Sequence, residues 1–264
     1  MKKLLIVGNW KMNLNTSQAS LLAQRLHDNL KLHRDIEVVL APSMLSLQPL
    51  STQIDRRKFR LAAQDAYYKD EGAYTGEVSF TMLRDLVNYV IIGHSERRLF
   101  FNENLDVVRD KVAACVRNDI TPILCIGETR QEHRAGEARQ VLHDQIMSGL
   151  ANLTAKEVAS MVIAYEPVWA ISTFDGELAK PADIERQFAF IRNQIRELYG
   201  AKPAESLRLL YGGSVDDQIA GGYLELEDCD GVLVGAASLN YQKFVGIVKA
   251  ADRLVHKQTK AGNG

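Results

Sequence analysis

The chain has 264 residues, of which 46% are hydrophobic, and a chain of this length can bury a large core within a single domain. Lysine and arginine (32) nearly balance aspartate and glutamate (33), and no run of five or six like charges occurs. This balance gives no indication of binding to nucleic acid or to a membrane surface, so we expect neither as a partner.

The chain opens with MKKLLIV, a basic start followed by a short apolar run. The run stops at Gly8 and Asn9, which makes it too short for a secretory signal and far too short to span a bilayer. We therefore expect a cytoplasmic protein.

Short apolar runs recur along the whole chain, and most are typical of strands buried on both faces, as in a parallel sheet. They lie at residues 4–8, 36–41, 59–64, 89–93, 120–127, 161–166, 207–212 and 231–235.

Amphipathic segments separate these runs, and each repeats its apolar residues at spacings of three and four, which indicates one apolar stripe per helix. Thr16 or Ser17 can cap the first helix, while Pro181 and Gly200 can begin and end a later one. The apolar stripes comprise Leu22, Leu26 and Leu30; Leu105, Val108, Val112 and Val116; Ile184, Phe188, Ile191 and Ile195; and Phe244, Val248, Ala251 and Val255.

The alternation of strand and helix, eight times over, predicts an α/β fold, a closed (β/α)8 barrel of the TIM type in one domain over residues 1–255. No linker or internal repeat divides the chain. An open, doubly wound sheet is the rival fold, but no G-x-G-x-x-G follows the first strand. Residues 256–264 are polar and lack periodicity, so we expect a disordered C-terminal tail.

The chain has three scattered cysteines, Cys115, Cys125 and Cys229, and no CxxC pair. This pattern indicates neither a disulfide framework nor a zinc site. We expect reduced, buried thiols and no bound metal.

Polar residues of distinct kinds follow several of the predicted strands. Asn9 and Lys11 follow the first strand, His94 the fourth and Glu166 the sixth, and glycine-rich segments follow the last two. In a barrel of this kind, the loops at the carboxyl ends of the strands build the active site. The strand ends therefore supply a base, an electrophile, a cation and backbone amides.

Several of these segments occur together and in order between residues 9 and 239: NWKMN, AQDAYYKDEGAYTGE, IIGHSERR, CIGE, YEPVWAI, YGGSV and DGVLVGAASL. They resemble the signature segments of the triosephosphate isomerase family. The resemblance implies interconversion of D-glyceraldehyde 3-phosphate and dihydroxyacetone phosphate through an enediolate, in glycolysis and gluconeogenesis. It also implies an enzyme that needs no cofactor.

The resemblance assigns a role to each polar residue at the strand ends. Glu166 is implied to be the general base, and His94 a neutral imidazole that donates a hydrogen bond to the developing oxyanion. Lys11 is implied to supply positive charge, with Asn9 orienting it and Glu96 as its partner. Without the resemblance, Glu166 could equally be an ordinary surface carboxylate, His94 a structural histidine and Lys11 a solvated surface lysine.

The phosphate group is implied to be held by backbone N–H groups rather than by an arginine clamp. These amides are those of Ser172, Ser214, Gly235 and Ala236. Glycines standing alone would equally suit tight turns. In addition, Ile171 and Leu233 are implied to cover the reacting carbons with apolar surface.

Residues 72–77 resemble the protruding third loop of the family, whose tip enters a neighbouring subunit. We therefore expect a homodimer with Thr75 at the tip of this loop. Glu77 and Arg97 are the expected pair across the interface, although an exposed pair of this kind contributes little by itself.

The chain departs from the family pattern at two places near the expected phosphate site. The loop after the sixth strand is slightly longer than usual and contains Ser172 and Phe174 where glycines are common. Ala236 replaces the second glycine of a V-G-G pair. We expect these changes to affect loop closure more than the proton transfer.

Two other functions remain open on the sequence. The same proton transfer could act on a four-carbon substrate, a tetrulose phosphate such as an erythrulose phosphate, if the longer loop enlarges the pocket. Alternatively, the chain could be a non-catalytic phosphate-binding barrel, which the intact Lys11, His94 and Glu166 disfavour.

Overall fold

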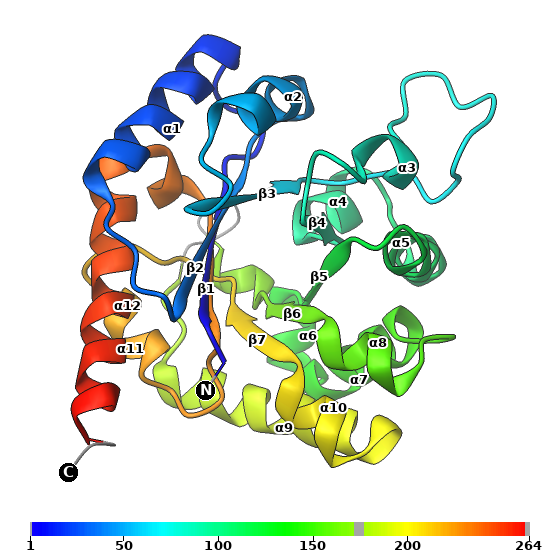
Figure 1. Cartoon of the computed structure of the whole chain (residues 1–264). Coiled ribbons are helices and arrows are strands. Elements are labelled where there is room, and N and C mark those ends of the chain that lie inside the picture. The colour runs from blue at the N-terminus through cyan, green and yellow to red at the C-terminus, as the bar shows by residue number, and fades with distance from the viewer. Residues whose placement is uncertain (1, 172–176, 262–264) are drawn as a thin grey trace.

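The computed structural model describes residues 2–171 and 177–261. Its centre is a closed barrel in which each strand pairs in parallel with the next and the eighth returns to the first (Figure 1). The strands are β1 (Leu4–Asn9), β2 (Ile36–Ala41), β3 (Phe59–Ala63), β4 (Tyr89–Ile92), β5 (Thr121–Ile126), β6 (Val162–Tyr165), β7 (Arg208–Tyr211) and β8 (Gly231–Val234). The expected (β/α)8 barrel is confirmed.

Helices surround the barrel and connect its strands (Figure 1). Several connections contain more than one helix, so there are more helices than strands. They are α1 (Thr16–Asn29), α2 (Met44–Gln53), α3 (Phe80–Leu83), α4 (Ser95–Phe100), α5 (Leu105–Arg117), α6 (Arg130–Ala135), α7 (Ala138–Gly149), α8 (Ala155–Ser160), α9 (Pro181–Tyr199), α10 (Ala201–Ser206), α11 (Ala220–Leu224) and α12 (Tyr241–Ala261), with 3₁₀ turns η1 (Val168–Ala170) and η2 (Ala236–Leu239).

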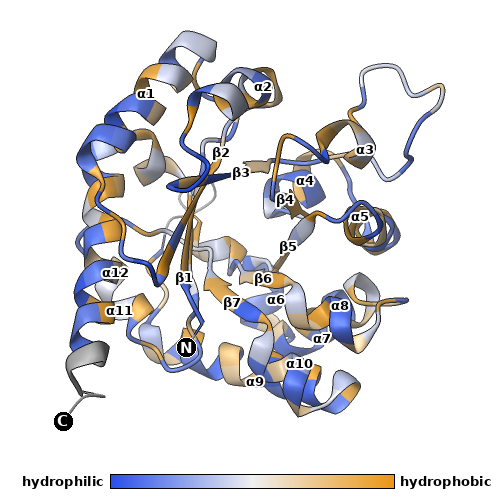
Figure 2. Cartoon of the chain, viewed as in Figure 1, coloured by the Kyte–Doolittle hydropathy of each residue, from blue (hydrophilic) through white to orange (hydrophobic). Residues whose placement is uncertain are grey.

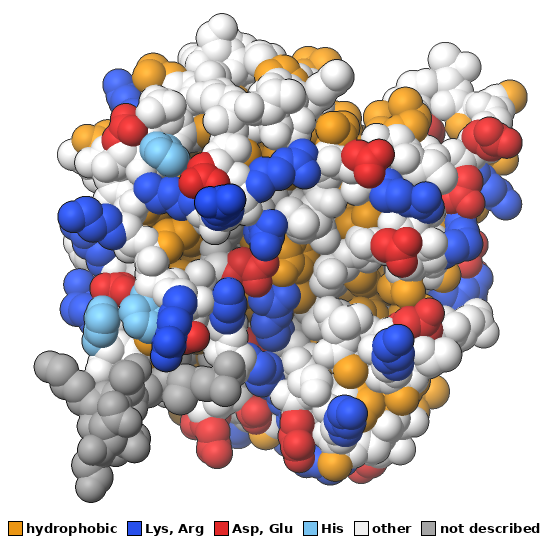
Figure 3. Space-filling model, viewed as in Figure 1, with side chains coloured by type: hydrophobic (Ala, Val, Ile, Leu, Met, Phe, Trp, Pro, Cys, Tyr) orange, Lys and Arg blue, Asp and Glu red, His pale blue; other side chains and the backbone are white. Residues whose placement is uncertain are grey.

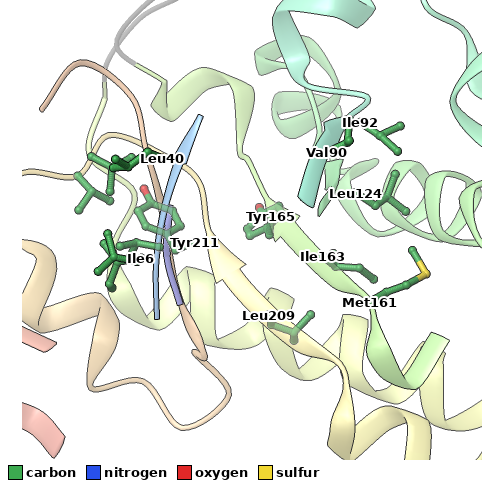
Figure 4. Packing of buried hydrophobic residues seen from close by; sticks show 14 of the residues in the cluster. Ile6, Leu40, Val90, Ile92, Leu124, Met161, Ile163, Tyr165, Leu209 and Tyr211 are labelled. Atoms are coloured by element: carbon green, nitrogen blue, oxygen red, sulfur yellow. The ribbon is translucent and has the colours of Figure 1, made fainter. Parts of the chain in front are cut away.

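Two apolar clusters hold the barrel together. Successive side chains of a strand point to opposite faces, so Leu5 and Val7 belong to the cluster inside the barrel and Ile6 to the cluster beneath the helices. Figure 4 shows Ile163 and Leu209 of neighbouring strands in this outer cluster. Figure 2 shows largely apolar strands at the centre and helices in which hydrophilic and hydrophobic residues alternate. The strands are apolar on both faces because both faces are covered.

The helix ends follow the sequence signals in part. Pro181 begins α9, and Gly200 follows its last residue with a φ of 89°, as expected. The cap of α1 differs from the prediction. Asn15 rather than Thr16 or Ser17 accepts from the amide of Gln18, and the Gln18 side chain returns the bond in a capping box.

The C-terminal helix α12 extends to Ala261, so residues 256–261 are helical in a segment expected to be a disordered tail. The three cysteines are buried free thiols, as expected. Burial raises the pKa of Cys229 to about 12. None of the helices within residues 2–171 and 177–261 has an apolar stretch long enough to cross a bilayer.

Candidate active site

A cavity of about 530 Å³ opens at the carboxyl ends of the strands. Its wall brings together the sequence-predicted site residues from both ends of the chain. They are Asn9, Lys11, His94, Glu166, Ile171, Ser214, Leu233, Gly235 and Ala236. Ser172, the remaining residue expected to bind phosphate, lies outside the described residues.

Glu166 follows β6 directly and is only 1% exposed. Its Oε2 accepts a hydrogen bond from the backbone N–H of Ser95 at 3.3 Å. Its Oε1 lies 3.4 Å from Nε2 of His94 and accepts no hydrogen bond from any described residue. Buried carboxylate oxygens are normally hydrogen-bonded. This oxygen therefore has an open acceptor position beside the cavity.

The absence of a side chain on Gly212 leaves room for the Glu166 side chain. A Cβ on Gly212 would lie 2.6 Å from Cγ of Glu166, which is closer than real Cβ atoms approach a neighbour. The two residues lie at the ends of adjacent strands, where the amide of Gly212 donates to the carbonyl of Tyr165 at 2.8 Å. The place of the carboxylate therefore depends on a residue that has no side chain.

His94 occupies the position just before α4, where its Nδ1 accepts a hydrogen bond from the backbone N–H of Glu96 at 3.2 Å. An amide can only donate, so Nδ1 is the acceptor and the proton of a neutral ring lies on Nε2. His94 thus presents an N–H donor, on Nε2, at the cavity wall, where Oε1 of Glu166 lies 3.4 Å away without a hydrogen bond between them.

Lys11 places its amine on the same cavity wall. Its Nζ lies 2.6 Å from Oε1 of Glu96, and a Cβ added to Gly235 would lie 3.8 Å from this Nζ. The backbone of Lys11 has a φ of 51°, a conformation that side chains rarely adopt. Asn9 accepts from the Lys11 amide at 3.1 Å, and Gln64 donates to the Lys11 carbonyl at 2.9 Å. These two contacts hold the strained backbone in place.

The amide of Ser214, expected to bind phosphate, is already engaged. Its N–H and its hydroxyl both donate to the carbonyl of Ala170, at 3.0 and 2.8 Å. Gly235 and Ala236 lie at the start of the 3₁₀ turn η2, on the cavity wall. Phosphate binding by the Ser214 amide therefore requires that its bond to Ala170 be given up.

Comparison with known proteins agrees with this geometry. A model of the triosephosphate isomerase family matches residues 4–251. The chain belongs to the triosephosphate isomerase family. It is 42% identical to the triosephosphate isomerase of Chloroherpeton thalassium over 96% of this chain and 100% of that protein. It is 40% identical to that of Trichlorobacter lovleyi over 94% of this chain and 99% of that protein, and 41% identical to that of Roseiflexus sp. over 94% and 97%.

Several residues that support this triosephosphate isomerase site were missed from the sequence. Gln64 holds the backbone of Lys11, and the Ser95 amide holds Glu166. Asp216 and Lys243 also line the cavity. Among the supporting residues, Gly212 stands in the segment YGGSV. The glycines of that segment were interpreted as part of a phosphate-binding segment or a tight turn. The contact of Gly212 with Glu166 depends on the approach of two strand ends.

Two further points concern the departures from the family pattern and the possibility of a metal site. Of the two departures, Ala236 lies on the cavity wall, whereas the changed loop residues Ser172 and Phe174 lie outside the described residues. Within residues 2–171 and 177–261, no group of three or more metal-ligating side chains is placed to hold a metal ion.

Proposed function

We propose that this chain interconverts D-glyceraldehyde 3-phosphate and dihydroxyacetone phosphate, as an aldose–ketose isomerase of glycolysis and gluconeogenesis, without a cofactor. Family membership supports this proposal, and one observation in the site carries it. The Oε1 atom of Glu166 is buried, accepts no hydrogen bond from the described chain and faces the Nε2 atom of His94 in the cavity. A base with an open acceptor position beside a proton donor suits proton transfer next to a carbonyl.

The reaction needs only these side chains. Glu166 removes a proton from the carbon beside the substrate carbonyl, while Nε2–H of His94 donates to the carbonyl oxygen as negative charge develops. Lys11 lies on the same wall and offsets that charge. The hydroxyl proton on the neighbouring carbon's oxygen passes to the first oxygen by way of Nε2 of His94, and return of the proton from Glu166 to the neighbouring carbon completes the isomerisation, so no atom is gained or lost.

The phosphate group binds at the other side of the cavity. We assign it to the backbone amides of Ser214, Gly235 and Ala236, together with Ser172 beyond the described residues. Binding exchanges the Ser214–Ala170 bond for a bond to the phosphate. Ile171 and Leu233, both buried on the cavity wall, cover the reacting carbons and exclude water.

We also propose a homodimer. The segment between β3 and α3, which carries the exposed Thr75 and Glu77, extends away from the body of the molecule (Figure 1). Large exposed apolar side chains occur in the connections after the first four strands: Met12 (96% exposed), Leu45, Tyr74, Met82 and Phe101. A second copy would cover them. Light scattering should give twice the chain mass of 29.5 kDa, and the mass of one chain would contradict the proposal.

Arg97 already has partners within its own chain. Its Nε lies 2.9 Å from Oδ2 of Asp65 and 2.5 Å from Oε1 of Glu103. The pair of Glu77 with Arg97 across the interface is therefore proposed as an addition to this cluster. Over the face in Figure 3, positive and negative side chains are interspersed. This distribution offers no single-sign patch on that face for nucleic acid or a membrane surface. We propose a small sugar phosphate and a second copy as the partners of a cytoplasmic enzyme.

Turnover tests this proposal against its rivals. Purified protein and the Glu166→Gln variant are assayed with glyceraldehyde 3-phosphate in a coupled assay, and with tetrulose phosphates in parallel. We expect fast turnover of the triose phosphate that the variant loses by several orders of magnitude. A strong preference for a tetrulose phosphate would assign the four-carbon reaction instead. Binding without turnover of either substrate would assign a non-catalytic barrel.

A further inference from the structure

His133 lies on α6, outside the cavity, and contacts the turn that follows Glu166. Its ring packs against the indole of Trp169, with ring centroids 4.5 Å apart and an angle of 36° between the planes. Its Nδ1 lies 3.4 Å from Oε1 of Glu128. The His133 side chain is 46% exposed whereas that of Glu128 is fully buried, so the histidine is open to solvent and the carboxylate is not.

Glu128 ties this turn to the end of β5. Its Oε1 accepts from Nε1 of Trp169 at 2.8 Å, and its backbone carbonyl accepts from the amide of Val168 at 3.0 Å. The hydroxyl of Tyr165 donates to the same carboxylate at 3.1 Å. Burial, and then the charge of Glu128, raise the pKa of Tyr165, so this hydroxyl stays protonated. The turn η1 is thus anchored to a buried carboxylate.

The other side of the turn is joined to the phosphate site. The carbonyl of Ala170, the last residue of η1, accepts both hydrogen bonds from Ser214. The Ser214 amide can bind phosphate only when this carbonyl moves away or the bond is otherwise broken. Any contact that holds η1 in its present place therefore competes with phosphate for Ser214.

We propose that His133 is a positioning residue whose charge sets how firmly η1 is held, and through η1 the affinity of the site for phosphate. This inference rests on the proposed function of the same site. A protonated His133 forms an ion pair with Glu128 and places a cation against the Trp169 ring. A neutral His133 loses both attractions. A charged His133 therefore strengthens the anchor and weakens substrate binding.

Among the charged groups of α6, its flanks and the start of α9, Glu128 is the carboxylate that lies against the His133 ring, with its Oε1 3.4 Å from Nδ1. Within α6 and its flanks, Glu132 accepts from Thr129, and Arg130 pairs with Glu177 at 3.1 Å. On α9, Asp183 pairs with Arg186. The exposed Arg134 and Glu137 complete the charged side chains along this helix.

Two variants separate charge from packing. His133→Phe keeps a ring against Trp169 without a charge, and His133→Arg keeps a charge at every pH. The KM for glyceraldehyde 3-phosphate and the inhibition constant for inorganic phosphate are measured from pH 8 to 5.5. The phosphate group itself takes up a proton near pH 6, so the proteins are compared with one another at each pH.

We expect the ratio of wild-type to His133→Phe KM to rise about two- to fivefold on acidification, with similar kcat values for the two proteins. His133→Arg should bind phosphate weakly even at pH 8. A ratio that is the same at every pH would mean that His133 contributes packing only, and would overturn the proposal.

Fluorescence of Trp169 tests the contact without relying on catalysis. The chain has two tryptophans, and Trp10 is fully buried. In the absence of substrate, acidification should change the emission of the wild type and leave His133→Phe and Trp169→Phe unchanged. Identical responses of wild type and His133→Phe would overturn the inference even in an active enzyme. Absence of turnover with a His133-dependent emission change would instead contradict the proposed function alone.

Discussion

The two ends of the barrel use polar side chains in opposite ways. At the amino end, Arg208 donates to Glu37 at 2.9 Å and to the hydroxyl of Tyr89 at 2.7 Å, and this hydroxyl donates to Glu37 at 2.8 Å. Burial raises the pKa of Tyr89 to about 12, so its proton remains in place. At the carboxyl end, Oε1 of Glu166 accepts no hydrogen bond from the described chain.

This difference separates stability from function within one sheet. The charges at the amino end satisfy one another, so they fill the barrel at little net cost. The carboxyl end keeps an unsatisfied buried oxygen and, at Lys11, a strained backbone. Such features persist where a substrate is to supply the missing partner. Substitutions at the two ends should therefore affect different measurements.

Replacement of His94 should give the largest loss of activity among the changes that leave Glu166 in place. We expect His94→Gln to lower kcat about 10²- to 10³-fold, because it removes a fixed donor to the developing oxyanion. Steady-state kinetics measure the loss. His143→Gln is a matched control, because His143 contacts Gln194 away from the cavity. Equal losses in both variants would contradict a specific role for His94.

A smaller loss is expected from crowding of the base. Gly212→Ala should lower kcat/KM about 10- to 100-fold. The new Cβ would lie 2.6 Å from Cγ of Glu166, so the carboxylate must move away from its place beside the cavity. Gly221→Ala is the control, since among the described residues no atom beyond its chain neighbours and its own helix backbone lies within 4 Å of the Cβ that it adds. Kinetics and circular dichroism are compared for both. An active Gly212→Ala enzyme would show that Glu166 tolerates displacement.

The smallest effect concerns a charged cluster that follows β3 and does not line the cavity, in which Asp65 contacts Lys111 at 2.7 Å. Burial raises the pKa of Asp65 to about 6, despite the attraction of Lys111. A raised pKa means that the folded chain holds this proton more tightly. The stabilising contribution is therefore complete below the unfolded pKa near 4 and is lost as the pH rises through about 6.

Urea unfolding at pH 5 and pH 7 measures this contribution against Asp65→Asn, which does not titrate. From pH 5 to pH 7, the wild type should lose about 1 kcal/mol of unfolding free energy relative to the variant. A constant difference, or a relative gain by the wild type, would place this cluster with the mutually satisfied charges of the amino end.

Periodicity predicted most of the fold. The apolar runs and the spacings of three and four gave all eight strands and the main helices, because a parallel barrel buries both faces of its strands. Local competition explains the different cap of α1. Asn15 rather than Thr16 caps α1 because Gln18 completes its capping box. Amphipathic spacing ends at Val255, yet α12 continues to Ala261.

Placement at the cavity was predictable where a residue lies within two positions of a strand end, as Lys11, His94 and Glu166 do. It was not predictable where a contact joins distant parts of the chain. Gln64 lies 53 residues from Lys11, with which it bonds, and nothing in its neighbours marks this role. The bond from Ser214 to Ala170 is likewise set by how the strand ends meet.

The most direct test of the difference between the barrel ends pairs two isosteric substitutions, Glu166→Gln and Glu37→Gln. Turnover of glyceraldehyde 3-phosphate per folded molecule and the free energy of unfolding are measured for both. Glu166→Gln should lower kcat about 10³-fold without loss of stability. Glu37→Gln should lose about 2 kcal/mol of stability and keep its turnover. Retained turnover in Glu166→Gln, or a loss of stability there as large as in Glu37→Gln, would contradict the account.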